Sequence, residues 1–128
     1  MSYYISRTIE SRFDNALAKV VDALKGEGFG VLTDIDVAAT MKQKLGIEFR
    51  PYRILGACNP PLAHKALSAE DKIGVMLPCN VIVQEAGAGK VEVAAIDPRT
   101  AMERVGNPAL MDLANEVADK LARVISAI

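Results

Sequence analysis

The sequence contains few of the residues on which several common functions depend. Its 128 residues include no tryptophan, one histidine and two cysteines, and aromatic residues make up only 5%. The bases of single-stranded nucleic acids stack on aromatic side chains, so the chain offers few stacking platforms. Fifteen basic and 16 acidic residues give a net charge of −1, which leaves no positive excess to attract phosphates. We therefore expect no nucleic acid among the partners of this protein.

Long apolar runs are absent as well. Although 51% of the residues are hydrophobic, no segment approaches the roughly 20 apolar residues that cross a bilayer. The first residues, Met1 to Arg7, lack the basic start and apolar stretch of a secretory signal. These features predict a cytoplasmic protein with no membrane partner. The length predicts a single domain over residues 1–128, large enough to fold without a disulfide or a metal.

The pattern of apolar residues predicts alternating strands and helices. Strands are expected at about residues 3–9, 30–35, 52–58, 79–86 and 91–96. Helices are expected to begin at the capping or starting residues Ser11, Asp36, Pro60 and Asn107-Pro108, with a short helical turn at 99–105. This order predicts an α+β fold with a single, mostly antiparallel five-stranded sheet and helices packed on one face.

The end of the last helix allows two interpretations. Val124, Ile125 and Ile128 lie close together near the C-terminal end of the sequence. They belong to an apolar face that is large enough to cover a sheet. The same cluster could instead help to form a contact between two copies of the chain.

The two cysteines lie in similar local sequences. Cys58 is the centre of G-A-C-N-P and Cys79 the centre of L-P-C-N-V, and each stands at one end of a predicted strand. If these two strands pair antiparallel, the end of the first faces the start of the second. Directly opposed residues have Cα atoms about 4.5–5.5 Å apart. We therefore predict that Cys58 and Cys79 face each other across adjacent strands.

The helix that is predicted to begin at Pro60 places its N-terminus beside Cys58. Free N–H groups at a helix N-terminus favour a thiolate or a bound anion. His64 lies early in the same helix, and we expect its side chain to point back toward the thiols. The candidate site therefore consists of Cys58, Asn59, Pro60, His64, Cys79 and Asn80.

Several interpretations of the two thiols are open at this point. Free cysteines are often buried and behave as small apolar residues, so the pair could be purely structural. A stabilised thiolate would instead suit redox or sulfur chemistry. Two cysteines and His64 could form a three-ligand metal site, but the spacing Cys58-x5-His64-x14-Cys79 matches no standard zinc signature. We predict neither a metal nor a cofactor.

Longer segments of the chain resemble one known family. The most specific is the block L-G-A-C-N-P, which ends at Pro60, followed by L-P-C, which ends at Cys79. Asp34 to Gly46, Asp97-Pro98 and Gly106-Asn107-Pro108 also fit. Together they make nearly the whole chain similar to the domain of unknown function 302 family.

The resemblance has implications for fold and assembly. It implies a TBP-like α+β fold in the order strand–helix–four strands–helix, and a homodimer. It places Cys58, Asn59, Pro60, Pro78 and Cys79 in the family pattern. It implies no activity.

Three functional hypotheses follow, and none of them assigns a reaction. The leading hypothesis is a thiol-based redox or sulfur-handling module that uses Cys58 and Cys79. The second is a domain that binds a small-molecule ligand between the sheet and the long helix, with the two thiols in the wall of its pocket. The third is a dimeric structural or interaction protein without catalysis.

Overall fold

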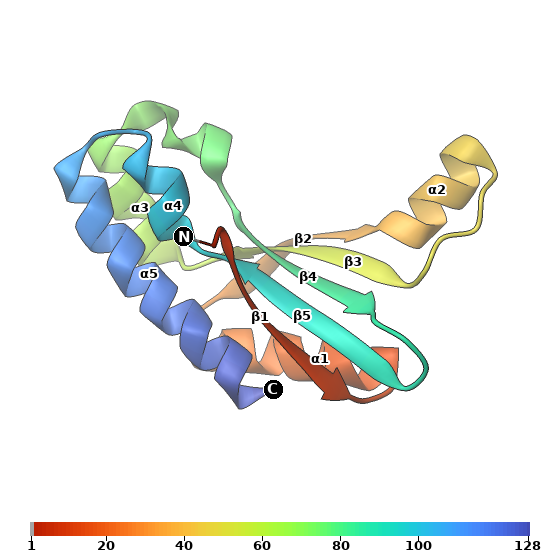
Figure 1. The fold of residues 1–128 in the computed structure, drawn as a ribbon. Helices are drawn as coiled ribbons and strands as arrows, with labels where there is room; N and C mark the ends of the chain where they lie inside the picture. Colours follow the sequence, from red (N-terminus) through yellow and green to blue (C-terminus); the bar gives the residue numbers. More distant parts are fainter. Residues whose placement is uncertain (1) are drawn as a thin grey trace.

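The computed structural model describes residues 2–128 and contains one five-stranded sheet (Figure 1). The strands lie in the order β1-β5-β4-β3-β2, and every neighbouring pair is antiparallel. Their bounds are β1 (Tyr4–Glu10), β2 (Gly30–Asp36), β3 (Tyr52–Cys58), β4 (Cys79–Glu85) and β5 (Lys90–Ile96). The α+β fold class with a single antiparallel sheet, predicted from the sequence, is confirmed.

Five α-helices and a 3-10 helix connect or follow the strands. They are α1 (Phe13–Gly26), α2 (Val37–Leu45), α3 (Pro60–Ala69), η1 (Asp71–Met76), α4 (Pro98–Glu103) and α5 (Pro108–Ala127). Several ends follow from local chemistry. The Asp36 side chain accepts a hydrogen bond from the Ala39 N–H at 2.9 Å and caps α2. Gly46 ends α2 in the left-handed conformation, with φ 67°.

One predicted cap is wrong. Ser11 does not cap α1, because the helix begins one residue later than expected and Arg12 occupies the cap position. The Ser11 hydroxyl instead donates to the Arg12 carbonyl at 2.9 Å. The first turn of α1 therefore lacks a side-chain cap.

The main core lies between the sheet and two helices, α1 and α5 (Figure 1). Successive side chains of a strand point to opposite faces of a sheet, so alternate residues of β3, β4 and β5 face these helices. They meet an apolar stripe of α1 that includes Val20 and Leu24, and a stripe of α5 that includes Leu121 and Val124. The buried strand residues include Leu55, Val81, Val83, Val91 and Val93.

The C-terminal end of α5 belongs to this core. Val124 and Ile125 are buried and Ile128 packs against the same cluster, which agrees with the interpretation of these residues as part of the apolar face that covers the sheet. Arg7 on β1 fixes the end of the helix, because its Nη1 donates to the carbonyls of Ser126 at 2.9 Å and Ile128 at 2.7 Å. Positive charge is favourable beside the unpaired carbonyls at a helix C-terminus.

The opposite face of the sheet, which we call the open face, is not covered by α1 or α5 (Figure 1). Ile54, Ile82 and Ala94 lie on it, because the residues next to them in their strands face the core and successive side chains alternate between the two faces. These core-facing neighbours are Leu55 in β3, Val81 and Val83 in β4, and Val93 and Ala95 in β5. Beside this face, residues 37–51 extend away from the sheet (Figure 1). We call this segment, which contains α2, the arm.

A close approach of three segments occurs at Gly56 in β3. The side chains of Thr33 in β2 and Pro78 before β4 both lie against its Cα. A Cβ atom at residue 56 would overlap Thr33 Oγ1 and lie 2.7 Å from Pro78 Cγ. Only glycine therefore fits here without a shift of the neighbouring strands.

We expect Gly56→Ala to lower the free energy of unfolding by about 1–3 kcal/mol, because the added methyl group forces its neighbours apart. Urea denaturation followed by circular dichroism measures this change. Gly30→Ala is the matched control, since Gly30 is also a strand glycine and its added Cβ would meet nothing within 4 Å. Equal destabilisation by the two substitutions would contradict this account of Gly56.

Candidate functional site

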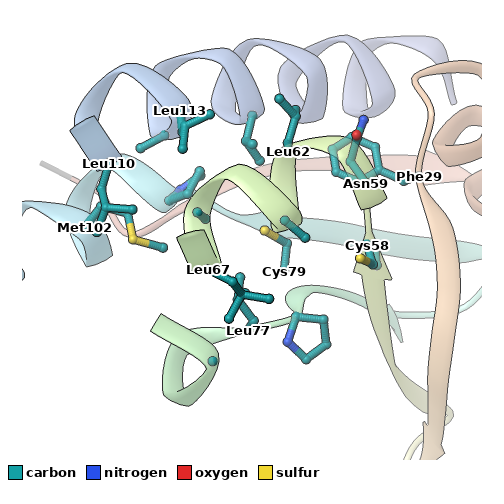
Figure 2. Close-up of a pocket in the computed structure, with 18 of the residues that line it drawn as sticks. Phe29, Cys58, Asn59, Leu62, Leu67, Leu77, Cys79, Met102, Leu110 and Leu113 are labelled. Carbon is teal, nitrogen blue, oxygen red and sulfur yellow. The ribbon is translucent and has the colours of Figure 1, made fainter. Parts of the chain in front are cut away.

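A cavity of about 330 Å³ lies at the end of the sheet where β3 ends and β4 begins (Figure 2). Helices α3, α4 and α5 form its other walls, which include Leu62, Ala66, Met102, Leu110 and Ala114. Its volume falls near the lower end of the range of about 300–1,000 Å³ that is usual for small-molecule sites. It is therefore large enough to hold a ligand.

The wall of this cavity is almost entirely apolar. Among the described residues, no charged side chain lines it, and its polar groups are Asn59 and the thiols of Cys58 and Cys79. The Asn59 amide is partly engaged elsewhere, because its Nδ2 donates to the Glu27 carbonyl at 3.3 Å. This bond ties the start of α3 to the turn that follows α1.

The two cysteines do not face each other directly, so this prediction is wrong. Cys79 in β4 is paired with Ala57, and Cys58 is paired with Gly30 on the other side of β3. The register is shifted by one residue from the expected one, because Leu55 and Ala57 of β3 must face the core together with Val81 of β4. Both cysteines are free, and Figure 2 shows their sulfur atoms apart in the cavity wall.

Cys79 carries a neutral thiol at physiological pH. Burial raises its pKa to about 11 from the ordinary value of 9.0, and the nearby Cys58 adds a smaller increase. The thiolate is the nucleophilic form of cysteine, so this environment suppresses the reactivity of Cys79.

The helix N-terminus beside Cys58 provides less stabilisation than the sequence suggested. Pro60 and Pro61 occupy the first two positions of α3, and proline has no backbone N–H. Ala63 uses its N–H to bond the Asn59 carbonyl at 2.9 Å. In the first turn, the N–H of Leu62 therefore remains free. A single free N–H is a weak site for an anion.

The other candidate residues are distributed over different surfaces. Pro60 starts α3 and is exposed. His64 is exposed on α3 and does not line the cavity, so its side chain is not directed at the thiols as we expected. Asn80 faces a second hollow, on the open face of the sheet. The structure thus brings together Cys58, Asn59 and Cys79.

Most of the cavity wall consists of residues that sequence reasoning did not select. Met102 of α4 and Leu110 and Ala114 of α5 are examples. Each occupies an ordinary apolar position of its helix. The sequence feature that could have indicated this cavity wall is a pair of apolar helix faces, one on α3 and one at the start of α5, at the same end of the sheet.

Helix α4, which closes one side of the cavity, is held by a buried carboxylate. Asp97 is 4% exposed and caps α4, because its Oδ1 accepts from the Arg99 N–H at 3.1 Å. The Arg99 side chain adds hydrogen bonds from Nε at 3.0 Å and Nη2 at 2.8 Å. The hydrogen bonds from Arg99 hold the pKa of Asp97 below its usual value of 3.8.

Two kinds of site are absent from residues 2–128. No group of three or more His, Cys, Asp or Glu residues in that range is arranged to hold a metal ion. No helix in that range is both long enough and apolar enough to span a membrane.

Comparison with known proteins identifies the family. The family model named domain of unknown function DUF302 matches residues 5–128. The chain belongs to the DUF302 family. A crystal structure described as an uncharacterized conserved protein DUF302 from Bacillus stearothermophilus is similar, with 26% sequence identity and a TM-score of 0.91. The match covers 99% of this chain and 98% of that chain. No curated protein matches this DUF302 chain.

We expect Cys79 to be alkylated slowly. In a Cys58→Ser variant, iodoacetamide at pH 8 should modify Cys79 about a hundredfold more slowly in the folded protein than in the urea-unfolded chain. The reason is that a pKa of about 11 leaves about one-hundredth of the usual thiolate. The rate in the folded protein should continue to rise above pH 9. Equal rates in the folded and unfolded chains would contradict a buried, neutral thiol.

We expect Asp97→Asn to destabilise the protein at neutral pH by about 1–2 kcal/mol, because the ionised cap of α4 is lost. Since the folded pKa of Asp97 is lowered, its stabilisation is present above about pH 4 and disappears as the pH falls further. Urea denaturation at pH 7 and pH 3 should therefore show a difference between variant and wild type that shrinks with acid. Asp22→Asn, at an exposed position of α1, is the control.

Proposed function

We propose that this DUF302 domain binds a small, neutral, apolar molecule in the cavity between α3, α4, α5 and the sheet. The observation that carries the proposal is a cavity of about 330 Å³ whose described wall has no charged side chain. Apolar pockets with a few placed polar groups are typical of small-molecule sites.

Because the described wall of the cavity has no charged side chain, a ligand that fits there should be neutral. An ionised group inside this cavity would lose its hydration without gaining a partner of opposite charge, which costs several kcal/mol. A neutral ligand avoids this cost and gains free energy from burial of its apolar surface, about 25 cal/mol per Å². One hydroxyl or carbonyl group on the ligand can be accommodated beside Asn59.

The two thiols act in this proposal as wall residues. Sulfur is soft and polarizable, and a neutral thiol offers a weak donor and a weak acceptor to a ligand. The alternative role, redox or sulfur transfer through Cys58 and Cys79, has less support. The raised pKa of Cys79 and the missing N–H groups at Pro60 and Pro61 both disfavour a thiolate.

A neutral fluorescent probe tests the proposal. N-phenyl-1-naphthylamine should gain fluorescence on mixing with the protein, because it enters an apolar environment. Ala63→Phe should reduce its binding at least tenfold, since Ala63 lines the cavity and a phenyl ring there occupies the ligand volume. Ala69→Phe, at an exposed position on the same helix, is the matched control and should bind as wild type does.

Competition and protection separate this site from non-specific surface binding. 1-Octanol should displace the probe at a concentration at least tenfold lower than octanoate, because the cavity lacks a cation for the carboxylate. Bound octanol should also slow the alkylation of Cys79. This protection can be measured without any substitution in the cavity. No gain in fluorescence, equal displacement by octanoate, or equal loss in both phenylalanine variants would each overturn the proposal.

A further inference from the structure

The side-chain amide of Asn59, which lines the cavity at the start of α3, is held in one orientation. Its Nδ2 donates to the Glu27 carbonyl at 3.3 Å. Only the nitrogen of an asparagine side chain can donate to a carbonyl, so this bond distinguishes the nitrogen from the oxygen. Gly28 packs against the same nitrogen, since a Cβ atom at residue 28 would lie 3.0 Å from it. The amide nitrogen therefore faces the turn after α1.

The amide oxygen of Asn59, Oδ1, has no partner among residues 2–128. Although Asn59 occupies the cap position of α3, its side chain accepts no N–H of that helix. Its one side-chain hydrogen bond to the described chain is the bond from Nδ2. Every buried side-chain nitrogen and oxygen of the described residues has a partner, so the unpaired Oδ1 is an accessible atom. Because Asn59 lines the cavity, this oxygen is available to a molecule inside it.

No other side chain of the described cavity wall is a comparable acceptor. The other polar groups are the thiols of Cys58 and Cys79, and a neutral thiol is only a weak donor and a weak acceptor. Cys79 stays neutral at physiological pH, because burial raises its pKa to about 11. The strongest hydrogen bond between a ligand and a side chain of this wall is therefore one that the ligand donates to Asn59.

The position of Asn59 also gives the ligand a direction. Figure 2 shows Asn59 and Phe29 at one end of the cavity and Met102 and Leu110 at the other. The wall between the two ends is apolar and includes Leu62 of α3. A ligand with one polar group gains most when that group lies at Asn59 and its hydrocarbon part extends toward Met102 and Leu110.

We propose that the cavity selects a neutral alcohol, whose hydroxyl group donates to Asn59 Oδ1 and whose hydrocarbon part lies against the apolar wall. This inference rests on the proposed ligand site and specifies the chemical class that the site takes. Asn59 is then the residue that determines specificity, because it distinguishes a hydroxyl group from a carbonyl or ether oxygen on the same carbon skeleton.

The discrimination depends on whether Oδ1 of Asn59 is paired when the cavity is filled. A bound alcohol replaces the hydration of Oδ1 with a direct hydrogen bond, and its own oxygen can still accept from a thiol. A bound ketone has no donor, so it removes Oδ1 from water and leaves it unpaired. An unpaired acceptor in an apolar site is costly. Sites that hydrogen-bond a hydroxyl group therefore reject analogues that lack one.

Displacement of N-phenyl-1-naphthylamine by 2-octanol and by 2-octanone measures this discrimination. The two competitors have the same carbon skeleton and are both neutral, so they gain nearly the same free energy from apolar burial. In the wild type, 2-octanol should displace the probe at a concentration about tenfold lower than 2-octanone, because only the alcohol can pair with Oδ1.

Two asparagine variants locate the effect. In Asn59→Ala, the ratio of the two displacement concentrations should fall to about twofold or less, because the acceptor is gone. Asn80→Ala is the matched control, since Asn80 also follows a cysteine but lines the hollow on the open face of the sheet rather than the cavity. This control should keep the wild-type ratio. Circular dichroism checks that both variants are folded.

A measurement on the wild type does not depend on the folding of any variant. In the NMR spectrum of protein with isotopically labelled asparagine, the side-chain carbonyl carbon of Asn59 should shift when 2-octanol binds, because its oxygen accepts a new hydrogen bond. At equal occupancy of the cavity, 2-octanone should shift it much less. The side-chain carbonyl carbon of Asn80 should respond to neither compound.

The possible outcomes separate this inference from the proposed function. Binding of the probe with equal displacement by 2-octanol and 2-octanone would overturn the preference for an alcohol and leave the apolar site in place. A folded Asn59→Ala variant with the wild-type ratio, or an Asn59 carbonyl carbon that does not respond to bound 2-octanol, would overturn the role of Asn59. A probe that does not bind at all would overturn the proposed function, and the inference with it.

Discussion

The register between β3 and β4 is the constraint on which the rest of the structure depends. Leu55 and Ala57 of β3 and Val81 and Val83 of β4 all have to face α1 and α5, and a shift of one residue between the strands would turn one of these two sets toward solvent. The same register places Ile54 and Ile82 together on the open face, and Gly56 under Pro78. The register between β3 and β4 thus determines both which residues lie at the cavity and which lie on the open face.

Much of the fold could be predicted from the sequence, because the capping and turn residues indicate the same helix and strand boundaries as the pattern of apolar residues. The Asp36 cap, Gly46 and the prolines at the start of α3 and α5 mark helix boundaries that the structure reproduces. The cysteine geometry could not be predicted in the same way. Both Cys58 and Cys79 stand at strand ends, where a strand boundary gives no information on pairing, and only the burial of Ala57 and Val81 selects the register. The cavity is assembled from apolar residues of three helices that look like any core residue in the sequence.

The block around Cys58 has a structural explanation for most of its residues. Gly56 is required by the close approach of Thr33 and Pro78, Asn59 bonds the Glu27 carbonyl, and Pro60 begins α3. These contacts join the end of β3 to the turn after α1 and to the segment before β4. The two cysteines lie in the cavity wall, and Cys79 also packs against the main core.

The pairing of β1 with β5 has a consequence for how the chain acquires its structure. Tyr4 is paired with Ile96, and Arg7 bonds carbonyls near residue 128, so the first strand is completed by the last part of the sequence. During synthesis, β1 leaves the ribosome long before β5 and α5 exist. Contacts between such distant residues carry a loop-closure cost that is met before they add stability, and they slow folding. The hairpin of β4 and β5, whose partners are close in sequence, can form first and offer β1 an edge on which to pair.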